Sequence, residues 1–423
     1  MQNIYNEYVN SSGVCTDTRK SEPGCIFFAL KGDFFDGNQF VEEALNKGAR
    51  LAVIDDPDRQ CEGKTILVND ALKTLQELAK YHRSKLSIPI IALTGSNGKT
   101  TTKELIASVL MTKFCVFATK GNLNNHIGVP LSILSIKEQH EVAIIEMGAN
   151  HLNEIQFLTK IAQPDYGLIT NIGRAHLEGF GSIAGVTKGK KELYDYIGNT
   201  NGEVFLNSAD PILDQIKPNA IIHRYGGDAA ISGNINSQSE LLRIEITIGN
   251  EKIMVQTNLV GGYNLSNILA AACVGAHFKV SLKDICKGLE TYVPNNHRSQ
   301  FIKTGHNNVV LDAYNSNPSS VEAALENFAK REEENKLVIL GDMLELGADS
   351  RSEHANAIQL LKELDLDSIL VGSLFGLEDQ DLFPCFENAE QTLTYLENNP
   401  IKGRTILIKG SRGIKLESVL SAL

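Results

Sequence analysis

The sequence IIALTGSNGKTTTKELIASVL, residues 90–110, decides how the middle of this chain folds. The apolar residues 90–93 predict a buried strand, and the apolar residues among 105–110 fall on one face of a helix. Between strand and helix lies TGSNGKTT, residues 94–101, a glycine-rich turn with Lys-Thr at the start of the helix. A strand, a glycine-rich turn and a helix in this order form a cradle for phosphate groups.

The residue types in this turn suit a phosphate ligand. Gly95 and Gly98 let the backbone aim several N–H groups at one anion, and the helix N-terminus adds partial positive charge. Lys99 is placed to reach the β- and γ-phosphates, and the Thr100 hydroxyl to bind Mg²⁺. A turn that merely joins strand to helix has no need of Lys-Thr at this point. We therefore predict a nucleotide-phosphate site made of Gly95, Ser96, Asn97, Gly98, Lys99, Thr100 and Thr101.

Length, charge and composition narrow the class of protein. A chain of 423 residues predicts about three domains, and an apolar fraction of 42% suffices for ordinary globular cores. A net charge of −11 argues against nucleic acid as a partner. The longest uncharged apolar run, residues 268–276, is far shorter than the ~20 residues of a membrane span, and we see no signal peptide. Seven scattered cysteines without a C-x-x-C pair are typical of reduced thiols, so we expect a cytoplasmic protein.

Two polar residues follow buried strands beyond the phosphate turn. Glu146 ends the apolar run 142–145, and ligands of parallel sheets bind at the carboxyl ends of the strands. A carboxylate there is placed to coordinate Mg²⁺ on nucleotide phosphates, an interpretation that we favour over a solvated strand end. His176 follows a further strand, residues 167–170. A lone histidine is more often structural than a ligand, but this one could face the same edge as Glu146.

Several asparagines have two interpretations. Asn124 and Asn125 lie in the polar loop 119–130, where they suit contact with a ligand and equally suit capping of their own backbone. Asn267 precedes the small-residue helix 268–276, where Asn267 or Ser266 could simply be a cap.

Two charged clusters have plain structural interpretations when taken by themselves. Thr18 and Arg19, next to a strand of a small α/β unit, suit a turn with an exposed arginine. Lys190 belongs to a run in which three of the four residues 188–191 are lysines, a pattern typical of a solvated helix face.

The last part of the chain alternates strands with helices. This order predicts a parallel, doubly wound sheet. Its strands end in polar groups of both signs, among them Asp312, Asp342 and the run 409–412. No G-x-G-x-x-G occurs there, so a dinucleotide site is not indicated.

The shortened phosphate turn T-G-x-x-G-K-T-T resembles that of the Mur ligase superfamily, the ATP-dependent amide-bond-forming enzymes of peptidoglycan precursor synthesis and their folate relatives. The resemblance covers essentially the whole chain. Several stretches resemble the branch that adds D-alanyl-D-alanine to UDP-muramyl-tripeptide: GNLNNHIGVP at 121–130, EMGANH at 146–151, AHLEGFG at 175–181, DAYNSNP at 312–318, GDMLELG at 341–347 and KGSR at 409–412. Branches that add one amino acid usually carry D-Y-A-H-x-P in place of the fourth stretch.

This resemblance implies an α/β fold of three domains. Residues 1–82 would form a small domain that binds the UDP substrate, 83–295 a central ATP-binding domain with a parallel sheet, and 296–423 a doubly wound, Rossmann-like ligase domain. The terminal carboxylate of the tripeptide would attack the γ-phosphate of ATP to give an acyl phosphate, which the amine of D-alanyl-D-alanine then attacks. We expect small-molecule substrates, a monomer, and closure of the domains around the ligands.

The resemblance also implies roles for individual residues. The catalytic set would be Lys99, Glu146, His176 and Lys190, with Lys190 carbamylated. Of two Mg²⁺ ions, the first would bind Thr100 and Glu146, and the second His176 and Lys190. ATP would also contact Asn267, Arg298 and Asp312. The organic substrates would contact Thr18, Arg19, Asn124, Asn125, Asn315 and Asn317. This chain departs from the family pattern at His126, where glutamate is common, and at His297, where glycine is common.

Rival functions remain to be separated. Within the superfamily they are a muramyl ligase that adds a single amino acid and a folylpolyglutamate synthase. A P-loop ATPase or kinase would turn over ATP without both organic substrates. A non-catalytic protein of this fold would have no use for Lys99, Glu146, His176 and Lys190 together. The sequence does not tell whether the third residue of the tripeptide is L-lysine or a diaminopimelate.

Overall fold

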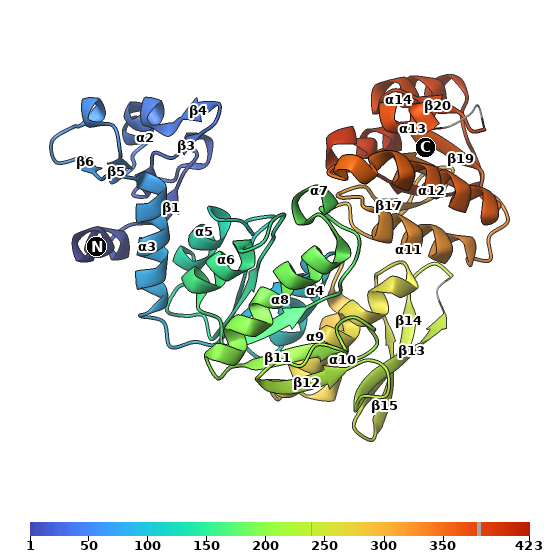
Figure 1. Ribbon diagram of the computed structural model, residues 1–423, viewed down its shortest axis with the longest axis horizontal. Helices are drawn as coiled ribbons and strands as arrows, with labels where there is room; N and C mark the ends of the chain where they lie inside the picture. The colour runs from blue at the N-terminus through green and yellow to red at the C-terminus, as the bar shows by residue number, and fades with distance from the viewer. Residues whose placement is uncertain (238, 379–381) are drawn as a thin grey trace.

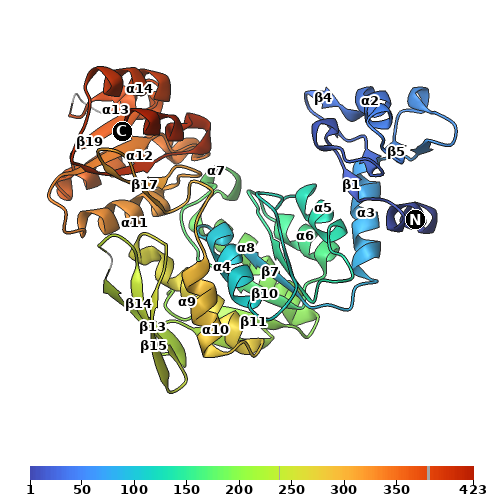
Figure 2. The ribbon, with the colours of Figure 1, turned by 180° about the vertical axis from the view of Figure 1, so that it is seen from behind.

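The computed structural model describes residues 1–237, 239–378 and 382–423, which form three α/β units (Figure 1). The N-terminal unit runs from α1 (Gln2–Val9) to β6 (Thr65–Leu67), and the middle unit from β7 (Ile90–Thr94) to α10 (Leu282–Thr291). The C-terminal unit runs from β16 (Gln300–Lys303) to η7 (Leu416–Ala422). The N-terminal and C-terminal units lie at opposite ends of the molecule with the middle unit between them, as Figure 2 also shows from behind. The predicted α/β class is confirmed.

The N-terminal unit is built on a parallel sheet with strand order β1-β2-β5-β6. Side chains of a strand alternate between its faces, so Phe27 packs toward one core and its neighbour Phe28 toward another. The remaining elements are β1 (Val14–Cys15), η1 (Thr18–Lys20), β2 (Ile26–Phe28), the hairpin β3 (Lys31–Gly32) and β4 (Phe35–Asp36), η2 (Gly37–Phe40), α2 (Val41–Asn46), β5 (Leu51–Ile54) and η3 (Pro57–Arg59).

Helix α3 (Ala71–Arg83) connects the first two units. It begins at an N-cap, because the side chain of Asp70 accepts a hydrogen bond from the backbone N–H of Lys73. Its apolar face packs against β2 and against α5 (Gly128–Leu134) and α6 (Glu154–Ala162) of the middle unit. At its end the buried Arg83 donates to the carboxylate of Asp165 at 3.0 Å. The helix therefore shares one core with both units.

The middle unit has a six-stranded parallel sheet in the order β12-β11-β10-β7-β9-β8. Helices cover both faces of this sheet, α5, α6 and α8 on one side and α4, α9 and α10 on the other, and the central strands β7 and β9 are buried along their whole length. Further elements are α4 (Lys99–Leu110), β8 (Val116–Ala118), β9 (Val142–Glu146), β10 (Tyr166–Ile169), α7 (Leu177–Phe180), α8 (Ile183–Asn199), β11 (Glu203–Asn207), β12 (Ile221–Tyr225), η4 (Gly262–Asn264) and α9 (Leu265–His277).

A second, antiparallel sheet in this unit was not predicted. It consists of β13 (Ile231–Ser237), β14 (Arg243–Ile248) and β15 (Glu251–Gln256). The alternation of isoleucine with polar residues along β14 is a period-two signal, and Ile244 and Ile246 are indeed buried against the α9 side of the unit.

The C-terminal unit has a six-stranded sheet in the order β16-β17-β21-β18-β19-β20. Five strands are parallel as predicted, but the edge strand β16 runs antiparallel to β17. The chain after β21 forms two 3₁₀ segments, η6 (Arg412–Ile414) and η7. The other elements are β17 (Asn308–Asp312), α11 (Pro318–Ala329), β18 (Lys336–Gly341), η5 (Gly347–Asp349), α12 (Ser350–Glu363), β19 (Ser368–Val371), α13 (Ser373–Glu378), β20 (Cys385–Phe386), α14 (Ala389–Asn398) and β21 (Thr405–Lys409). Among the described residues, no helix has the length and apolar character needed to cross a membrane.

Candidate active site

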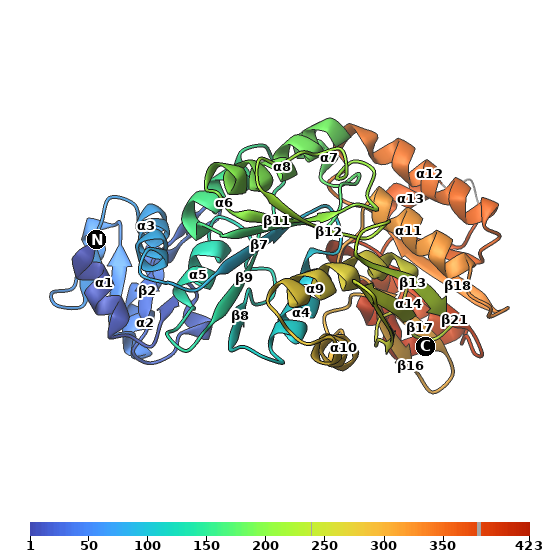
Figure 3. The same cartoon turned by 90° about the horizontal axis from the view of Figure 1, so that it is seen from below.

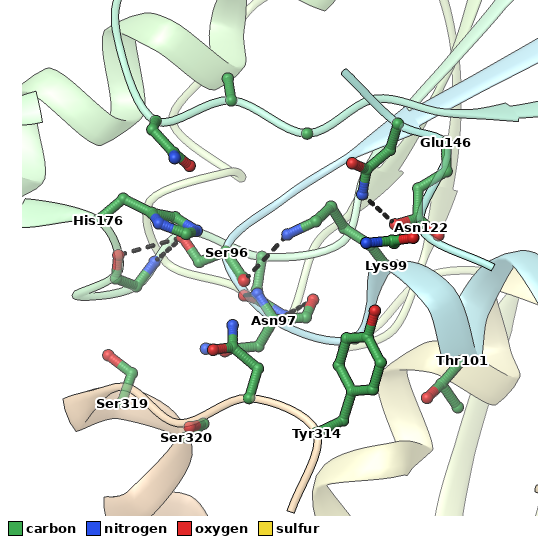
Figure 4. Close-up of a pocket in the computed structure, with 18 of the residues that line it drawn as sticks. Ser96, Asn97, Lys99, Thr101, Asn122, Glu146, His176, Tyr314, Ser319 and Ser320 are labelled. Carbon is green, nitrogen blue, oxygen red and sulfur yellow. Dashed lines mark hydrogen bonds between the residues drawn. The ribbon is translucent and has the colours of Figure 1, made fainter. Parts of the chain in front are cut away.

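A cavity of about 1040 Å³ lies where the carboxyl ends of the middle strands meet the C-terminal unit. Figure 4 shows Lys99 and Glu146 of the middle unit and Tyr314, Ser319 and Ser320 of the C-terminal unit around one space. The sequence-predicted residues that line it are Ser96, Asn97, Gly98, Lys99, Thr101, Asn124, Asn125, Glu146, His176, Asn267, Arg298, Asp312 and Asn315. His126 lines it as well. Thr18, Arg19, Gly95, Thr100, Lys190 and Asn317 are not among the lining residues.

The shape of the phosphate turn depends on a glycine and on a hydrogen bond to the end of the neighbouring strand. Gly98 has a left-handed φ of +75°, and a Cβ there would lie 2.6 Å from Oδ1 of Asn267. The backbone N–H of Asn97 donates to Oδ1 of Asn171 at 3.0 Å, which fixes the turn against the end of β10. Lys99 Nζ donates to the carbonyl of Gly95 at 2.7 Å. The loop thus has a fixed shape around the lysine.

Burial lowers the pKa of Lys99 to about 8, although the nearby Glu146 carboxylate acts in the opposite direction and Arg298 adds to the lowering. An ammonium in such a position is stabilised by an anion placed next to it. A phosphate group bound by this loop would therefore raise the pKa of Lys99 and hold its amine in the charged form.

The Glu146 carboxylate is 1% exposed and only half satisfied by the described residues. Its Oε1 accepts hydrogen bonds from Asn124 Nδ2 at 2.8 Å and from Thr100 Oγ1 at 3.3 Å. Its Oε2 has no hydrogen-bond partner, and the nearest cation, Lys103 Nζ, is 3.9 Å away. A buried carboxylate oxygen without a donor is costly, and a hard cation with oxygen ligands would remove that cost. Glu146 and Thr100 therefore fit a Mg²⁺ site.

His176 lies at the boundary between two units. It has a left-handed φ of +53°, and its Nδ1 is 2.6 Å from Oε2 of Glu345 in the C-terminal unit. The hydrogen bond with His176 holds the pKa of Glu345 below its usual value. The stretch 341–347 contributes to the family resemblance, but the sequence did not identify Glu345 as a site residue. Its partner His176 is 169 positions away in the chain.

Lys190 is fully buried just behind the cavity wall. Its Nζ donates to the carbonyl of Ala149 at 3.0 Å, and Ala149 itself lines the cavity. Burial, together with the charge of Lys99, lowers the pKa of Lys190 well below its usual value. The interpretation as a solvated helix face is wrong, because the side chain is shielded from water.

The C-terminal unit adds a charged pair and a stacked arginine. Asp312, at the end of β17, accepts from Lys409 Nζ at 2.7 Å, and the guanidinium of Arg298 lies 4.0 Å from the ring centroid of Tyr314. On the facing side, Asn267 accepts from Thr102 Oγ1 and donates to Asn264 Oδ1. Aromatic and amide groups around a phosphate loop suit the base and ribose of a nucleotide.

Two asparagines predicted to contact substrate make hydrogen bonds within the protein. Asn125 Oδ1 accepts from the backbone N–H groups of Ile127 and Gly128, and so caps its own loop. Asn317 is the N-cap of α11, and its Nδ2 donates to Asn97 Oδ1 at 2.7 Å across the unit boundary. Asn124 differs from these two, because its Nδ2 donates a hydrogen bond to the Glu146 carboxylate in the cavity.

Thr18 and Arg19 lie in η1 of the N-terminal unit and do not line this cavity. Figures 1 and 2 show the N-terminal unit at the opposite end of the molecule from the C-terminal unit. Arg19 is exposed and pairs with Asp17, with 2.8 Å between Arg19 Nη2 and Asp17 Oδ2. Thr18 is buried, and its carbonyl accepts from Lys47 Nζ. Within this arrangement the two predicted sites are separate.

Some lining residues were not predicted. Asn171, Tyr314 and Ser319 follow strands or begin a helix at the cavity edge. Their positions in the sequence could have identified them. Polar residues just after predicted parallel strands lie at the edge of the sheet where ligands bind.

Three family descriptions match consecutive parts of the chain. They are the catalytic domain of the Mur ligase family over residues 10–83, the Mur ligase middle domain over 93–275, and the Mur ligase glutamate ligase domain over 297–412.

Individual relatives agree over nearly the whole length. The UDP-N-acetylmuramoyl-tripeptide–D-alanyl-D-alanine ligase of Bacillus subtilis (strain 168) is 35% identical, covering 97% of this chain and 93% of the relative. The ligase of the same name from Escherichia coli (strain K12) is 33% identical, with 98% and 94% covered.

Solved structures agree as well. A crystal structure of MurF from Acinetobacter baumannii has a TM-score of 0.89 and 31% identity, with 99% and 97% covered. MurF from Thermotoga maritima in complex with ADP has a TM-score of 0.86 and 26% identity, with 98% and 97% covered. The chain belongs to the Mur ligase family, and within it to the UDP-N-acetylmuramoyl-tripeptide–D-alanyl-D-alanine ligases.

Proposed function

We propose that this chain joins D-alanyl-D-alanine to UDP-N-acetylmuramoyl-tripeptide with the cleavage of ATP to ADP and phosphate, as an ADP-forming ligase of cytoplasmic peptidoglycan precursor synthesis. The observation that carries the proposal is the cavity between two units. In it the Lys99 amine and the unpartnered Oε2 of the buried Glu146 lie beside a phosphate loop. Full-length similarity to relatives of that name supports the choice of substrates.

The proposed reaction proceeds in two balanced steps. A carboxylate oxygen of the tripeptide bonds to the γ-phosphorus of ATP, and the bond from that phosphorus to the β-bridging oxygen breaks, releasing ADP. The neutral amine of the dipeptide then bonds to the acyl carbon, phosphate leaves with one carboxylate oxygen, and the amine loses a proton. Phosphoryl transfer is mainly positioning and charge neutralisation, and Lys99 supplies one positive charge for two anions that repel each other.

Mg²⁺ would be held by Thr100 and Glu146 at one position and by His176 and a modified Lys190 at another. It would supply further positive charge to the phosphate groups. This chain's own residues orient those ligands. Asn124 fixes the Glu146 carboxylate by its hydrogen bond, and Glu345 fixes the ring of His176. Asn267, Arg298 and Asp312 would contact the nucleoside part of ATP.

We propose that Lys190 is carbamylated in the active protein. Carbamylation requires a neutral amine, and burial favours the neutral form of Lys190. Incubation of the full chain with ¹³C-bicarbonate should give a carbamate carbonyl resonance in the NMR spectrum. Lys190→Arg should lose this resonance, while Lys191→Arg, on the exposed side of the same helix, should keep it. Equal spectra for the two variants would contradict the modification.

We propose that residues 1–82, 83–295 and 296–423 act as three domains of a monomer that close around the substrates. Thr18 and Arg19 are assigned to the UDP end and Asn124 and Asn315 to the peptide end, so a substrate that reaches both sets requires approach of the end units. Scattering should show a smaller radius of gyration with an ATP analogue and both substrates. An unchanged radius would contradict closure.

Phosphate release from ATP tests the function. It should require Mg²⁺, the UDP-tripeptide and the dipeptide together, with a UDP-pentapeptide product by mass, and Lys99→Met should abolish it. Parallel assays with L-lysine and diaminopimelate tripeptides identify the natural third residue. Turnover with D-alanine alone would indicate a single-residue ligase. Release that ignores both organic substrates would indicate a P-loop ATPase.

A further inference from the structure

Three metal-binding side chains gather on the middle unit away from the cavity. They are Glu203, the first residue of β11, His223 of β12, and His277, the last residue of α9. Their ligand atoms all lie within 4.8 Å of one another. Glu203 Oε2 is 2.5 Å from His223 Nε2 and 3.9 Å from His277 Nε2. The proposed catalytic residues lie at the carboxyl ends of the parallel strands, whereas Glu203 lies at the amino end of its strand.

The fold itself brings these three side chains together. Glu203 and Phe205 share a face of β11, and the register of the parallel pair sets His223 beside Phe205. Helix α9 packs against β11 and β12 on that face, and Figure 3 shows this helix beside the sheet from below. His277 is the last residue of α9. The rings of Tyr166 and Phe205, with centroids 5.1 and 5.5 Å from that of His277, fix its position.

A plain ion pair accounts for only part of this arrangement. Glu203 Oε2 and His223 Nε2 form a short hydrogen bond, and this pair needs no third member. His277 is 20% exposed, and in the part of the chain that the structure describes neither of its ring nitrogens makes a hydrogen bond. Its ring centroid is only 4.4 Å from that of His223. His277 thus places a second imidazole beside the carboxylate oxygen that already contacts His223. Two imidazoles and one carboxylate oxygen in this arrangement can bind a single metal ion.

We propose that Glu203, His223 and His277 bind one divalent transition-metal ion such as Zn²⁺, with water as the fourth ligand. Two imidazoles and one carboxylate are a ligand set that suits Zn²⁺ and its late first-row neighbours, whereas Mg²⁺ prefers oxygen ligands alone.

A bound ion would link β11 and β12 to the C-terminal end of α9. The other end of α9 carries Asn264 and Asn267 of the cavity. Because the ion binds the folded state, it should raise the unfolding temperature of the chain. The site is independent of the proposed ligase activity, so its test does not require turnover.

Calorimetric titration of the metal-free full chain with Zn²⁺, in excess Mg²⁺, tests the proposal. We expect one ion per chain and a raised unfolding temperature. His223→Ala and His277→Ala should each weaken binding at least about tenfold, since loss of even an outer-shell partner has an effect of that size. His306→Ala, which removes an exposed histidine of the C-terminal unit, should leave binding unchanged.

Two further measurements keep the proposal testable if a histidine-to-alanine variant does not fold. Glu203→Gln keeps a polar side chain in place but removes the anionic ligand, so it should also weaken Zn²⁺ binding. Co²⁺ bound to the wild-type chain should give the visible absorption of a tetrahedral site, and His277→Ala should lose it. Equal Zn²⁺ affinity in wild type and a folded His277→Ala variant, or no binding by the wild type, would overturn the proposal and leave a Glu203–His223 ion pair.

Discussion

His176 Nδ1 lies 2.6 Å from Glu345 Oε2, and this contact joins the middle unit to the C-terminal unit at the edge of the cavity. Two residues earlier, Arg174 bridges the same boundary to Glu322 at 2.8 Å and to Glu353 at 3.1 Å. One loop after β10 therefore both lines the proposed ATP site and holds the C-terminal unit in place.

The contribution of the Glu345–His176 contact to the stability of the fold should depend on pH. Its pKa is lowered in the folded chain, so its contribution to stability is present above its ordinary pKa and is lost as pH falls through the lowered value. The carboxylate is partly exposed, so solvent screening limits the effect to less than about 1 kcal/mol. Glu345→Gln should lower the unfolding temperature at pH 7 and lose this difference below pH 4, as measured by calorimetry. Glu326→Gln, on the exposed surface of α11, is the control, and a difference that persists at low pH would contradict the assignment.

ATP binding should take up a proton near pH 8. Lys99 has a pKa of about 8 without ligand, so above this value its amine is mostly neutral, whereas the phosphates of ATP favour the charged form. ATP affinity should therefore fall as pH rises above 8, and calorimetry in buffers of different ionisation enthalpy should show proton uptake. Lys99→Arg remains charged, so its affinity should be flat over this range. An equally steep fall in the arginine variant would assign the titration to another group.

Glu146→Gln tests the metal role of the unpartnered oxygen. Glutamine can still accept the hydrogen bond of Asn124, but it lacks the negative charge that holds Mg²⁺. We expect kcat to fall by roughly 10²–10³, the usual effect of removing one electrostatic contact at a reacting centre, with a higher Mg²⁺ requirement. Glu138→Gln, an exposed position ahead of the same strand, should be unaffected. Normal turnover and Mg²⁺ dependence in Glu146→Gln would remove it from the site.

Gly98→Ala tests the shape of the phosphate turn. Alanine costs about 1 kcal/mol in a left-handed conformation, and here its Cβ would also lie 2.6 Å from Asn267 Oδ1. We expect nucleotide affinity to fall at least about tenfold, a loss of 1.4 kcal/mol or more. Gly121→Ala provides a matched control, because Gly121 has a φ of +55° with open space around it. Equal losses in the two variants would mean that backbone strain alone, and not the contact with Asn267, is responsible.

The sequence predicted those features that depend on neighbours in the chain. The strand 90–93 and the helix after the turn have clear periodicities, and the structure has β7 and α4 in their place. The apolar run 142–145, which is followed by Glu146, likewise lies in β9. Largely polar strands such as β13 carry no such pattern and were missed.

The residues that the sequence could not assign depend on contacts between distant segments. Asn124 and Asn125 are chemically identical neighbours, yet one contacts Glu146 and the other caps its loop, a difference that only the path of the backbone decides. Lys190 is one of several lysines in its helix, and its burial follows from which face of α8 packs against the sheet. Glu345 gains its role only when the C-terminal unit docks on the middle unit.

Transfer of an oxygen atom tests the central claim most directly. If the tripeptide carboxylate attacks the γ-phosphorus of ATP, one of its oxygens must leave with inorganic phosphate. With the terminal carboxylate labelled with ¹⁸O, the account predicts phosphate that carries one ¹⁸O and a UDP-pentapeptide that keeps the other, as measured by mass spectrometry. Unlabelled phosphate would show that water attacks ATP and would contradict the acyl-phosphate ligase mechanism.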